Sequence, residues 1–343
     1  MLLVGLRGEA EWTPEVSLRV QAVSGVLPSP DGALVVYAQT RHVVEAERSE
    51  SVSQVWLAGA YGSSRRQLTF GEKSATAPSF GPDSKSVYFV SARGGGPNIW
   101  RMPVDGGEAR PLLQWKGKIG HYAVSPDGKW VAFAGVLEDM DAARRAREKR
   151  DFRVVDANPR NHALWVAPLS GDAAAPRQIT GNGRHVATFH WAPDSRRIAF
   201  EHWPAPGADE WVRSDLAEVE VGPAAVRDLV KTAGPESTPF YSPDGKYLAF
   251  VQTPEKARWP GVARVAVMDR GTGAVRLLAT SEDERPLLLG WGGETLYFGE
   301  MRRTRSALYA VGLEGAPKLV YEPKRGTFFA GYNPNANLNA TGT

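Results

Sequence analysis

S-P-D-G-K-W-V-A-F-A, from Ser125 to Ala134, combines a tight turn with a strand. Pro126 fixes its own φ at a value that suits a turn, and the side chain of Asp127 bonds to its own backbone two residues on. Gly128 adopts positive φ without steric cost. Val131 and Phe133 then alternate with smaller neighbours, as in a half-buried strand. One such unit is common in proteins, so its recurrence decides the fold.

The same turn–strand unit recurs along the whole chain of 343 residues. Successive copies start 44 to 52 residues apart, except for one interval of 67 residues that contains an insertion. An internal repeat of this length points to a modular architecture. The copies are Ser29–Ala38, Gly81–Val90, Ser125–Ala134, Ala192–Glu201 and Ser242–Val251, with a sixth, Trp291–Glu300, that lacks the Pro-Asp pair.

A second recurring piece lies between the turns and consists of a strand, a glycine-containing turn and another strand. It is clearest in Asn98–Leu112 and Arg264–Leu278. Together with the turn–strand unit and the apolar stretch before it, each repeat holds four antiparallel strands. Four short strands in a repeat of about 45 residues are typical of a β-propeller, in which each blade covers its neighbour. The sequence therefore predicts an all-β propeller with six complete four-stranded blades and the start of a seventh.

The direction of the chain places the two largest insertions on one face of this propeller. The S-P-D-G turn joins the first and second strands of a blade and the glycine-containing turn joins the third and fourth, so both turns lie on the same face. Second-to-third connections and links between blades lie on the opposite face. The insertions, 135–161 and 202–214, are both second-to-third connections. Because insertions gathered on one face often mark the binding face, we expect function there.

The first insertion contains a segment with helical character. Leu137–Asp151 is highly charged, lacks Gly and Pro, and is rich in good helix formers, so it predicts an exposed helix. Two interpretations stay open, a solvated surface helix or part of a lid or docking surface. Under the second interpretation, Arg150 and Arg153 are candidate substrate-binding residues.

The second insertion mixes aromatic residues with carboxylates over Glu201–Asp215. Asp209 and Glu210 are candidate ligands for a substrate ammonium group, and Trp203 or Trp211 offers an aromatic face on which that group can pack. The alternative interpretation is a loop that its tryptophans fold onto itself. Asp209, Glu210 and Trp211 thus join the candidate substrate-binding residues.

The two ends of the chain differ from the repeats. Residues 1–20 form an N-terminal segment with a short helix, in which Thr13 is the N-cap and Pro14 the first helical residue. Residues 21–326 hold blades 1 to 6. Residues 327–343 read as the first strand and turn of a seventh blade, so we expect either a six-bladed ring with a tail or the front part of a longer protein. The second case predicts exposed apolar edges and self-association.

Composition narrows the classes of function. Hydrophobic residues make up 42% and charged residues 23% of the chain, as in an ordinary globular protein. Lys and Arg number 41 against 38 acidic residues, a balance that does not favour a nucleic-acid partner. The chain has no Cys, which excludes disulfides and zinc–thiolate sites. It has no run of 18 apolar residues, so we expect no membrane span.

Motifs for catalysis and cofactor binding are missing from the sequence. It contains no G-x-S-x-G nucleophile elbow, no phosphate-binding P-loop and no H-E-x-x-H zinc motif. His185 and His190 lie five positions apart in one predicted inner strand, and this odd spacing puts them on opposite faces and argues against a metal site. We therefore expect no catalytic residue, no metal site and no cofactor.

Five segments carry a resemblance to a known family: Trp12–Glu15, Ala22–Gly32, Pro239–Phe250, Arg258–Val265 and Glu284–Trp291. They resemble the propeller of the prolyl oligopeptidase family of serine peptidases, nearest to its acylaminoacyl-peptidase and dipeptidyl-peptidase branches. The resemblance covers the chain from Trp12 onward. The S-P-D-G repeats by themselves are also found in TolB-type propellers.

The resemblance implies a division of labour. In that family a C-terminal α/β-hydrolase domain carries the catalytic Ser, Asp and His, while the propeller caps the active site and restricts entry to short or unstructured peptides. The hydrolase domain is absent from this sequence, so no catalytic residue is carried over. The implied function is a non-catalytic, substrate-gating propeller that is inactive alone, with a peptide and a hydrolase domain as partners.

A second hypothesis comes from a different class of protein. It is a free-standing TolB-like propeller that acts as a scaffold for protein–protein contacts. For either function we expect a cytoplasmic location, or a periplasmic one if the true start of the chain lies upstream.

Overall fold

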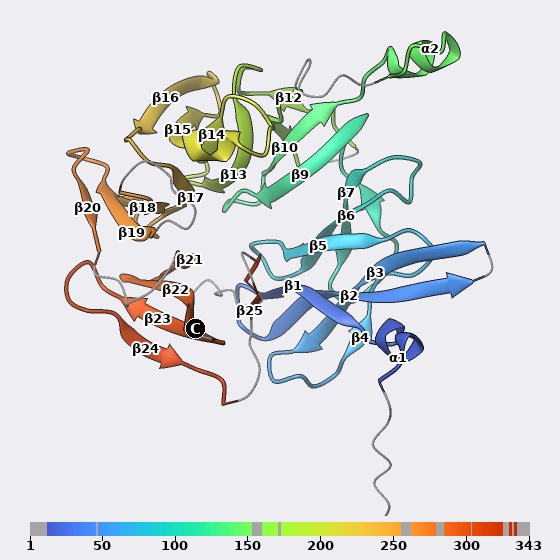
Figure 1. Ribbon diagram of the computed structural model, residues 1–343, viewed down its shortest axis with the longest axis horizontal. Coiled ribbons are helices and arrows are strands. Elements are labelled where there is room, and N and C mark those ends of the chain that lie inside the picture. Colours follow the sequence, from blue (N-terminus) through green and yellow to red (C-terminus); the bar gives the residue numbers. More distant parts are fainter. Residues whose placement is uncertain are drawn as a thin grey trace, which may run out of the picture.

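Six four-stranded antiparallel sheets follow one another around a ring in the computed structural model (Figure 1). The structure describes residues 12–45, 47–152, 160–170, 173–254, 262–278, 285–302 and 304–324, and the backbone of 329–330 and 333–334. The predicted all-β propeller with six complete blades is therefore confirmed.

The strands follow the chain order within every blade. Blades 1 to 3 consist of β1 (Ala22–Pro28), β2 (Leu34–Glu45), β3 (Arg48–Gly59) and β4 (Arg66–Gln67); β5 (Ala75–Phe80), β6 (Ser86–Ser91), β7 (Asn98–Pro103) and β8 (Arg110–Pro111); and β9 (Gly117–Val124), β10 (Trp130–Leu137), β11 (Ala163–Pro168) and β12 (Arg177–Gln178). Blades 4 to 6 consist of β13 (His185–Trp191), β14 (Arg197–Trp203), β15 (Asp215–Glu220) and β16 (Ala225–Val230); β17 (Glu236–Tyr241), β18 (Tyr247–Gln252), β19 (Arg264–Asp269) and β20 (Val275–Leu277); and β21 (Leu287–Gly292), β22 (Thr295–Arg302), β23 (Arg305–Val311) and β24 (Lys318–Tyr321).

Few helices accompany the blades. The predicted N-terminal helix is confirmed as α1 (Pro14–Leu18), where Thr13 Oγ1 accepts a hydrogen bond from the amide of Val16 at 3.3 Å. Among the described residues, no helix is long and apolar enough to cross a membrane. The predicted start of a seventh blade lies largely outside the described residues, which include there only the paired backbone of β25 (Phe329–Ala330) and β26 (Asn333–Pro334).

The S-P-D-G turn is held by its own side chains. In blade 3, Ser125 is fully buried, and its Oγ accepts a hydrogen bond from the amide of Trp130 at 2.9 Å. Asp127 Oδ1 accepts one from the amide of Lys129 at 3.1 Å. These bonds occupy backbone donors that have no partner elsewhere in the turn, which gives the Asp of all five turns, and the Ser of three of them, a structural role.

Ser replaces Gly in two of the turns, and the replacement links neighbouring blades. Gly128 adopts a φ of 69°, and Ser195 holds the corresponding position in blade 4 with a φ of 57°. This conformation is unfavourable for Ser. However, Ser195 Oγ accepts a hydrogen bond from the amide of Asp127 in blade 3 at 3.0 Å, which offsets the strain.

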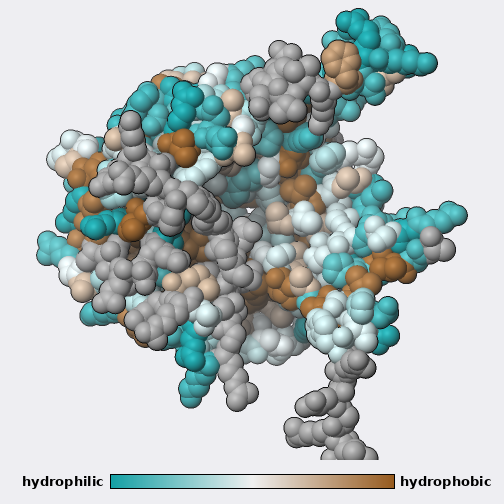
Figure 2. Space-filling view, in the orientation of Figure 1, coloured by the Kyte–Doolittle hydropathy of each residue, from teal (hydrophilic) through white to brown (hydrophobic). Residues whose placement is uncertain are grey.

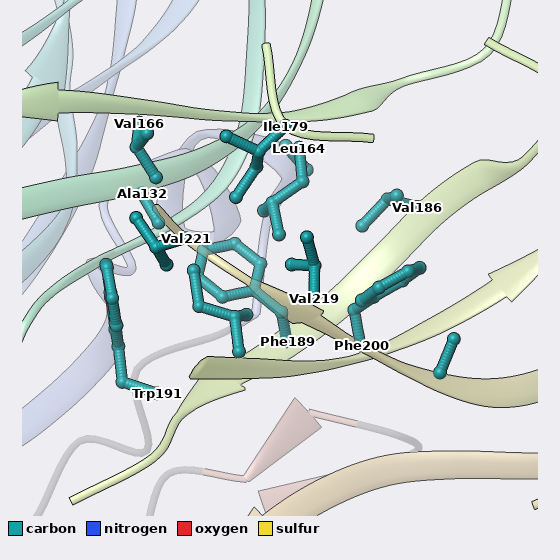
Figure 3. Close-up of a cluster of buried hydrophobic side chains, with 13 residues drawn as sticks. Ala132, Leu164, Val166, Ile179, Val186, Phe189, Trp191, Phe200, Val219 and Val221 are labelled. Atoms are coloured by element: carbon teal, nitrogen blue, oxygen red, sulfur yellow. The ribbon is translucent and has the colours of Figure 1, made fainter. Parts of the chain in front are cut away.

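The hydrophobic core lies between the blades. The described residues form five buried clusters, one at each interface from blades 1 and 2 through to blades 5 and 6. In the cluster between blades 3 and 4, Phe189 and Phe200 face Leu164 and Ile179 across the interface (Figure 3). Each blade thus buries its apolar surface against the next one, as the repeat predicts.

One phenylalanine position recurs in the second strand of five blades. Each of these side chains is fully buried and packs against the preceding blade; they are Phe89, Phe133, Phe200, Phe250 and Phe298. Blade 1 has Tyr37 at this position, and it is only half-buried. No buried cluster of the described residues joins blade 6 to blade 1, so Tyr37 faces the one interface that lacks such a core.

Candidate functional site

The long connections of the propeller gather on one face, which we call the insertion face. This face carries the second-to-third connections and the links between blades, and it lies opposite the S-P-D-G turns. One insertion separates β10 from β11 and the other separates β14 from β15. Their predicted positions in the blades, and hence their common face, are confirmed.

The insertion face has a third projection that the repeat does not predict, the long β2–β3 hairpin (Figure 1). Both strands have 12 residues and pair from Leu34 opposite Gly59 to Glu45 opposite Arg48. The sequence does contain a signal, because residues 39–53 lack Gly and Pro and include Thr and several Val, which favours paired strands over a loop.

The first insertion carries α2 (Ala142–Arg147), which confirms an exposed helix shorter than the predicted segment. α2 projects away from the ring (Figure 1), and hydrophilic residues cover it (Figure 2). The side chain of Arg150 is 71% exposed, and its Nη1 lies 3.6 Å from Glu148 Oε2. Arg153 lies outside the described residues. The structure therefore places Arg150 on a solvated arm and leaves its binding role a prediction.

The second insertion ends in the short helix η1 (Glu210–Arg213). Glu210 Oε2 accepts a hydrogen bond from Arg213 Nη1 at 2.9 Å, so one of the two predicted ammonium ligands already has a cationic partner. Asp209 lies exposed just before η1. A ligand would have to compete with Arg213 for the Glu210 carboxylate.

Trp211 connects the second insertion with blade 5. The guanidinium of Arg285 lies 5.8 Å from the centroid of the Trp211 ring, within the range of a cation–π contact. Arg285 Nη2 in turn donates to Ser237 Oγ on β17 at 3.0 Å. Trp211 is thus brought near the insertion-face end of the inner strand β17.

A buried carboxylate lies beside this contact. Glu201 on β14 accepts hydrogen bonds at Oε2 from Thr188 Oγ1 at 2.8 Å and from the amide of Thr238 at 3.1 Å. Burial raises the pKa of Glu201, and these two bonds oppose the shift. Thr238 has a φ of 56°, which a β-branched residue rarely adopts, and this strained backbone aims the amide at Glu201.

Sequence reasoning did not single out Glu201, although a signal exists. In the aligned copies of the repeat, Ala134 and Val251 occupy the corresponding position. A carboxylate in an otherwise apolar position needs a polar partner nearby, and Thr188 and Thr238 from two adjacent inner strands supply it.

The inner strands leave a partly solvated channel surface. Lys118 and His121 on β9 are exposed, as are Thr76 and Ala77 on β5. Lys118 lies at the insertion-face end of the channel because β9 begins on that face. Small, polar and basic side chains of this kind can contact an extended peptide. Within the described ranges, no group of three or more His, Asp or Glu side chains is placed to hold a metal ion.

Glu236, at the start of β17, predicts a pH-dependent stability. Its side chain is fully buried, and Oε1 accepts a hydrogen bond from the amide of Thr232 at 3.1 Å. Oε2 has no partner within the described part of the chain. Burial raises the pKa of Glu236 to about 7 from 4.5. Because the folded-state pKa lies above the unfolded one, stability is lost as the pH rises from 4.5 through 7.

We expect the native protein to lose about 3 kcal/mol of unfolding free energy relative to Glu236→Gln when the pH rises from 4.5 to 8. The variant removes the titrating group while keeping its shape. Urea unfolding at the two pH values measures the difference. A difference that stays constant with pH would show that Glu236 does not titrate with a raised pKa.

Comparison with known proteins agrees with the geometry. A family model described as the TolB beta propeller domain matches residues 28–168. Dipeptidyl-peptidase 5 of Porphyromonas gingivalis is 24% identical over 332 residues, which cover 88% of this chain and 48% of that protein. The chain thus spans about half the length of this curated relative.

Two solved structures share the fold. Acylaminoacyl peptidase of Pyrococcus horikoshii superposes with a TM-score of 0.69 at 16% identity, over 92% of this chain and 48% of that one. The β-propeller domain of the Trilobed protease from Pyrococcus furiosus gives a TM-score of 0.62 at 15% identity, over 89% of this chain and 86% of that domain. The predicted resemblance to peptidase propellers is confirmed. The chain is therefore a six-bladed β-propeller that is similar to the TolB beta propeller family over residues 28–168, to dipeptidyl-peptidase 5 in sequence and to acylaminoacyl peptidase in fold.

Proposed function

We propose that the chain is the non-catalytic, substrate-gating propeller of a prolyl oligopeptidase-like serine peptidase, in which a separate α/β-hydrolase domain cleaves the peptide. The observation that carries the proposal is the gathering of both insertions, the β2–β3 hairpin and the Trp211–Arg285 contact on one face around the channel. The similarity to dipeptidyl-peptidase 5 over 88% of the chain supports it.

The insertion face would have two roles in such an enzyme. Its projecting elements, α2 and the β2–β3 hairpin, would contact the hydrolase domain at the edge of the ring. The end of the channel near Lys118 and Trp211 would admit an extended peptide and exclude a folded one. The channel cannot widen, because moving the inner strands apart would disrupt the hydrophobic cores between blades. In this proposal the triad chemistry belongs to the hydrolase domain.

The scaffold hypothesis has narrower support. The TolB family model matches residues 28–168, which lie within blades 1 to 3, whereas the peptidase relative matches most of the chain. TolB-type turns occur in both classes of propeller, so they do not separate the two functions. We therefore favour the peptidase propeller.

Peptide entry can be tested with single-cysteine labels, because the chain has no Cys of its own. Lys118→Cys places a fluorophore at the insertion-face end of the channel, and Lys85→Cys places one on the opposite face, beside the turn of blade 2; both lysines are exposed. Titration with a short unstructured Gly-Ser-Ala peptide should change the fluorescence at position 118 in a saturable way and leave position 85 unchanged.

A folded domain of the same net charge as the peptide serves as the control ligand. It should produce no saturable response at position 118, because gating depends on an extended chain. Equal responses at both labelled positions, or equal responses to the folded domain and to the peptide, would contradict the gating proposal.

A further inference from the structure

Blade 4 contains a cavity of about 370 Å³ on the insertion face. Its walls come from the end of β14, the start of β15, the end of β16 and the two links that connect blade 4 with its neighbours. This volume lies within the range of small-molecule sites. The cavity has five charged lining residues, which are Arg184, Arg213, Asp215, Asp228 and Lys231.

The charges of the cavity form pairs of opposite sign. Arg184 Nη1 lies 2.6 Å from Asp228 Oδ1, and Lys231 Nζ lies 3.5 Å from Asp215 Oδ2. Arg213 is balanced by Glu210 just outside the wall, at 2.9 Å. A site with three cations and three carboxylates is neutral overall and offers both signs to a ligand within a small volume.

His202 adds no charge to this balance. Its Nε2 lies 2.8 Å from Arg184 Nη1, so the ring accepts a hydrogen bond from the guanidinium. Burial, together with the charge of Arg184, lowers the pKa of His202 to about 4. The imidazole is therefore neutral at pH 7, and it fixes the orientation of Arg184 along with Asp228.

Trp203 supplies an aromatic wall. Its ring lies 5.2 Å from that of His185, centroid to centroid, which holds the indole in place. The indole Nε1 is buried and has no hydrogen-bond partner among the residues that the structure describes. The indole therefore contributes its ring and not its N–H to the wall of the cavity.

We infer that this cavity binds a small zwitterion, an α-amino acid or a dipeptide. Arg213 and Lys231 would exchange their carboxylate partners for the carboxylate of the ligand, while Asp215 and Asp228 would bind its ammonium group. A ligand of one sign would satisfy one half of the site and face like charge from the other half. The inference rests on the cavity and does not require the gating function.

Isothermal titration calorimetry with three probes tests the inference: alanyl-alanine, N-acetyl-alanyl-alanine and alanyl-alanine amide. The first carries both charges, the second only the carboxylate and the third only the ammonium. We expect alanyl-alanine to bind about tenfold more tightly than either blocked form, because each blocked form loses a set of charge-assisted hydrogen bonds.

Matched lysine variants assign the binding to this cavity. Lys231 is 72% exposed and lies 3.5 Å from Asp215, and Lys246, on the opposite face, is 75% exposed and lies 3.2 Å from Asp244. Lys231→Met should weaken alanyl-alanine binding about five- to tenfold, and Lys246→Met should leave it unchanged. Both residues are exposed, so both variants should fold, which circular dichroism checks.

Equal affinity for alanyl-alanine and its N-acetyl form would overturn the inference in favour of a simple anion site. Equal effects of the two lysine variants, or no saturable heat from the folded native protein, would also overturn it. Failure of the gating proposal appears separately, as an absent response of the label at position 118 to the longer peptide.

Discussion

Phe200→Ala should lower the free energy of unfolding by about 3–5 kcal/mol. The Phe200 side chain has no exposed surface and lies in the cluster between blades 3 and 4, where it faces Leu164 and Ile179 (Figure 3). Its removal leaves a cavity between two sheets whose hydrogen bonds prevent them from collapsing into the gap. Urea unfolding monitored by both tryptophan fluorescence and circular dichroism measures the loss and tests whether unfolding is two-state.

Tyr37→Ala is the matched control for Phe200→Ala. Tyr37 holds the corresponding position in blade 1, but its side chain is only half-buried. It lies on the face of blade 1 that is turned toward blade 6, outside the buried cluster that joins blades 1 and 2. We expect Tyr37→Ala to cost about 1 kcal/mol, since fewer apolar contacts are lost. Equal costs at the two positions would mean that the interface between blades 6 and 1 is packed as tightly as the others.

Arg270→Met should be comparably severe, for an electrostatic reason. Glu218 on β15 is 3% exposed, and its Oε1 accepts a hydrogen bond from Arg270 Nη2 at 2.7 Å and another from Tyr241 OH. Arg270 is itself only 10% exposed and belongs to blade 5, so the pair joins two blades. Removal of the guanidinium leaves the buried Glu218 carboxylate without its buried cationic partner. We expect this loss to lower the free energy of unfolding by about 3–5 kcal/mol.

Arg227→Met is the control on the same carboxylate. Arg227 Nη2 lies 2.7 Å from Glu218 Oε2, but the Arg227 side chain is 59% exposed, so water can replace it. We expect a loss below about 1 kcal/mol. Similar losses in the two variants would show that the burial of Arg270 does not decide the strength of the pair.

The Arg270→Met deficit should also depend on pH. Burial pushes the pKa of Glu218 upward, but the hydrogen bonds from Tyr241 and Arg227 and the charge of Arg270 outweigh burial and hold the pKa below 4.5. A lowered folded-state pKa gives stability that is present above pH 4.5 and is lost as the pH falls through the folded value. The variant lacks part of this stabilisation at every pH, whereas the native protein loses it only in acid. The difference in unfolding free energy between the two proteins should therefore shrink below pH 4.5.

The blades were predictable from the sequence because their determinants are local. The turn around Ser125 and Asp127 closes with hydrogen bonds to residues at most five positions away. The buried phenylalanine follows at a fixed distance in the second strand, so turn chemistry and strand alternation repeat together. The same reasoning placed both insertions on one face, since strand direction alone decides that.

The candidate site required the tertiary structure because its partners come from different blades. Arg285 meets Trp211, and Arg270 meets Glu218 52 positions away in the sequence. Arg184 and Lys231 line one cavity although they belong to different links of blade 4. No local pattern specifies such pairs; they depend on how far each blade is rotated from the next and on the path of each link. Hydrogen bonding and alternation within a repeat thus determined the architecture, and only the packing of one repeat against another determined which charges meet.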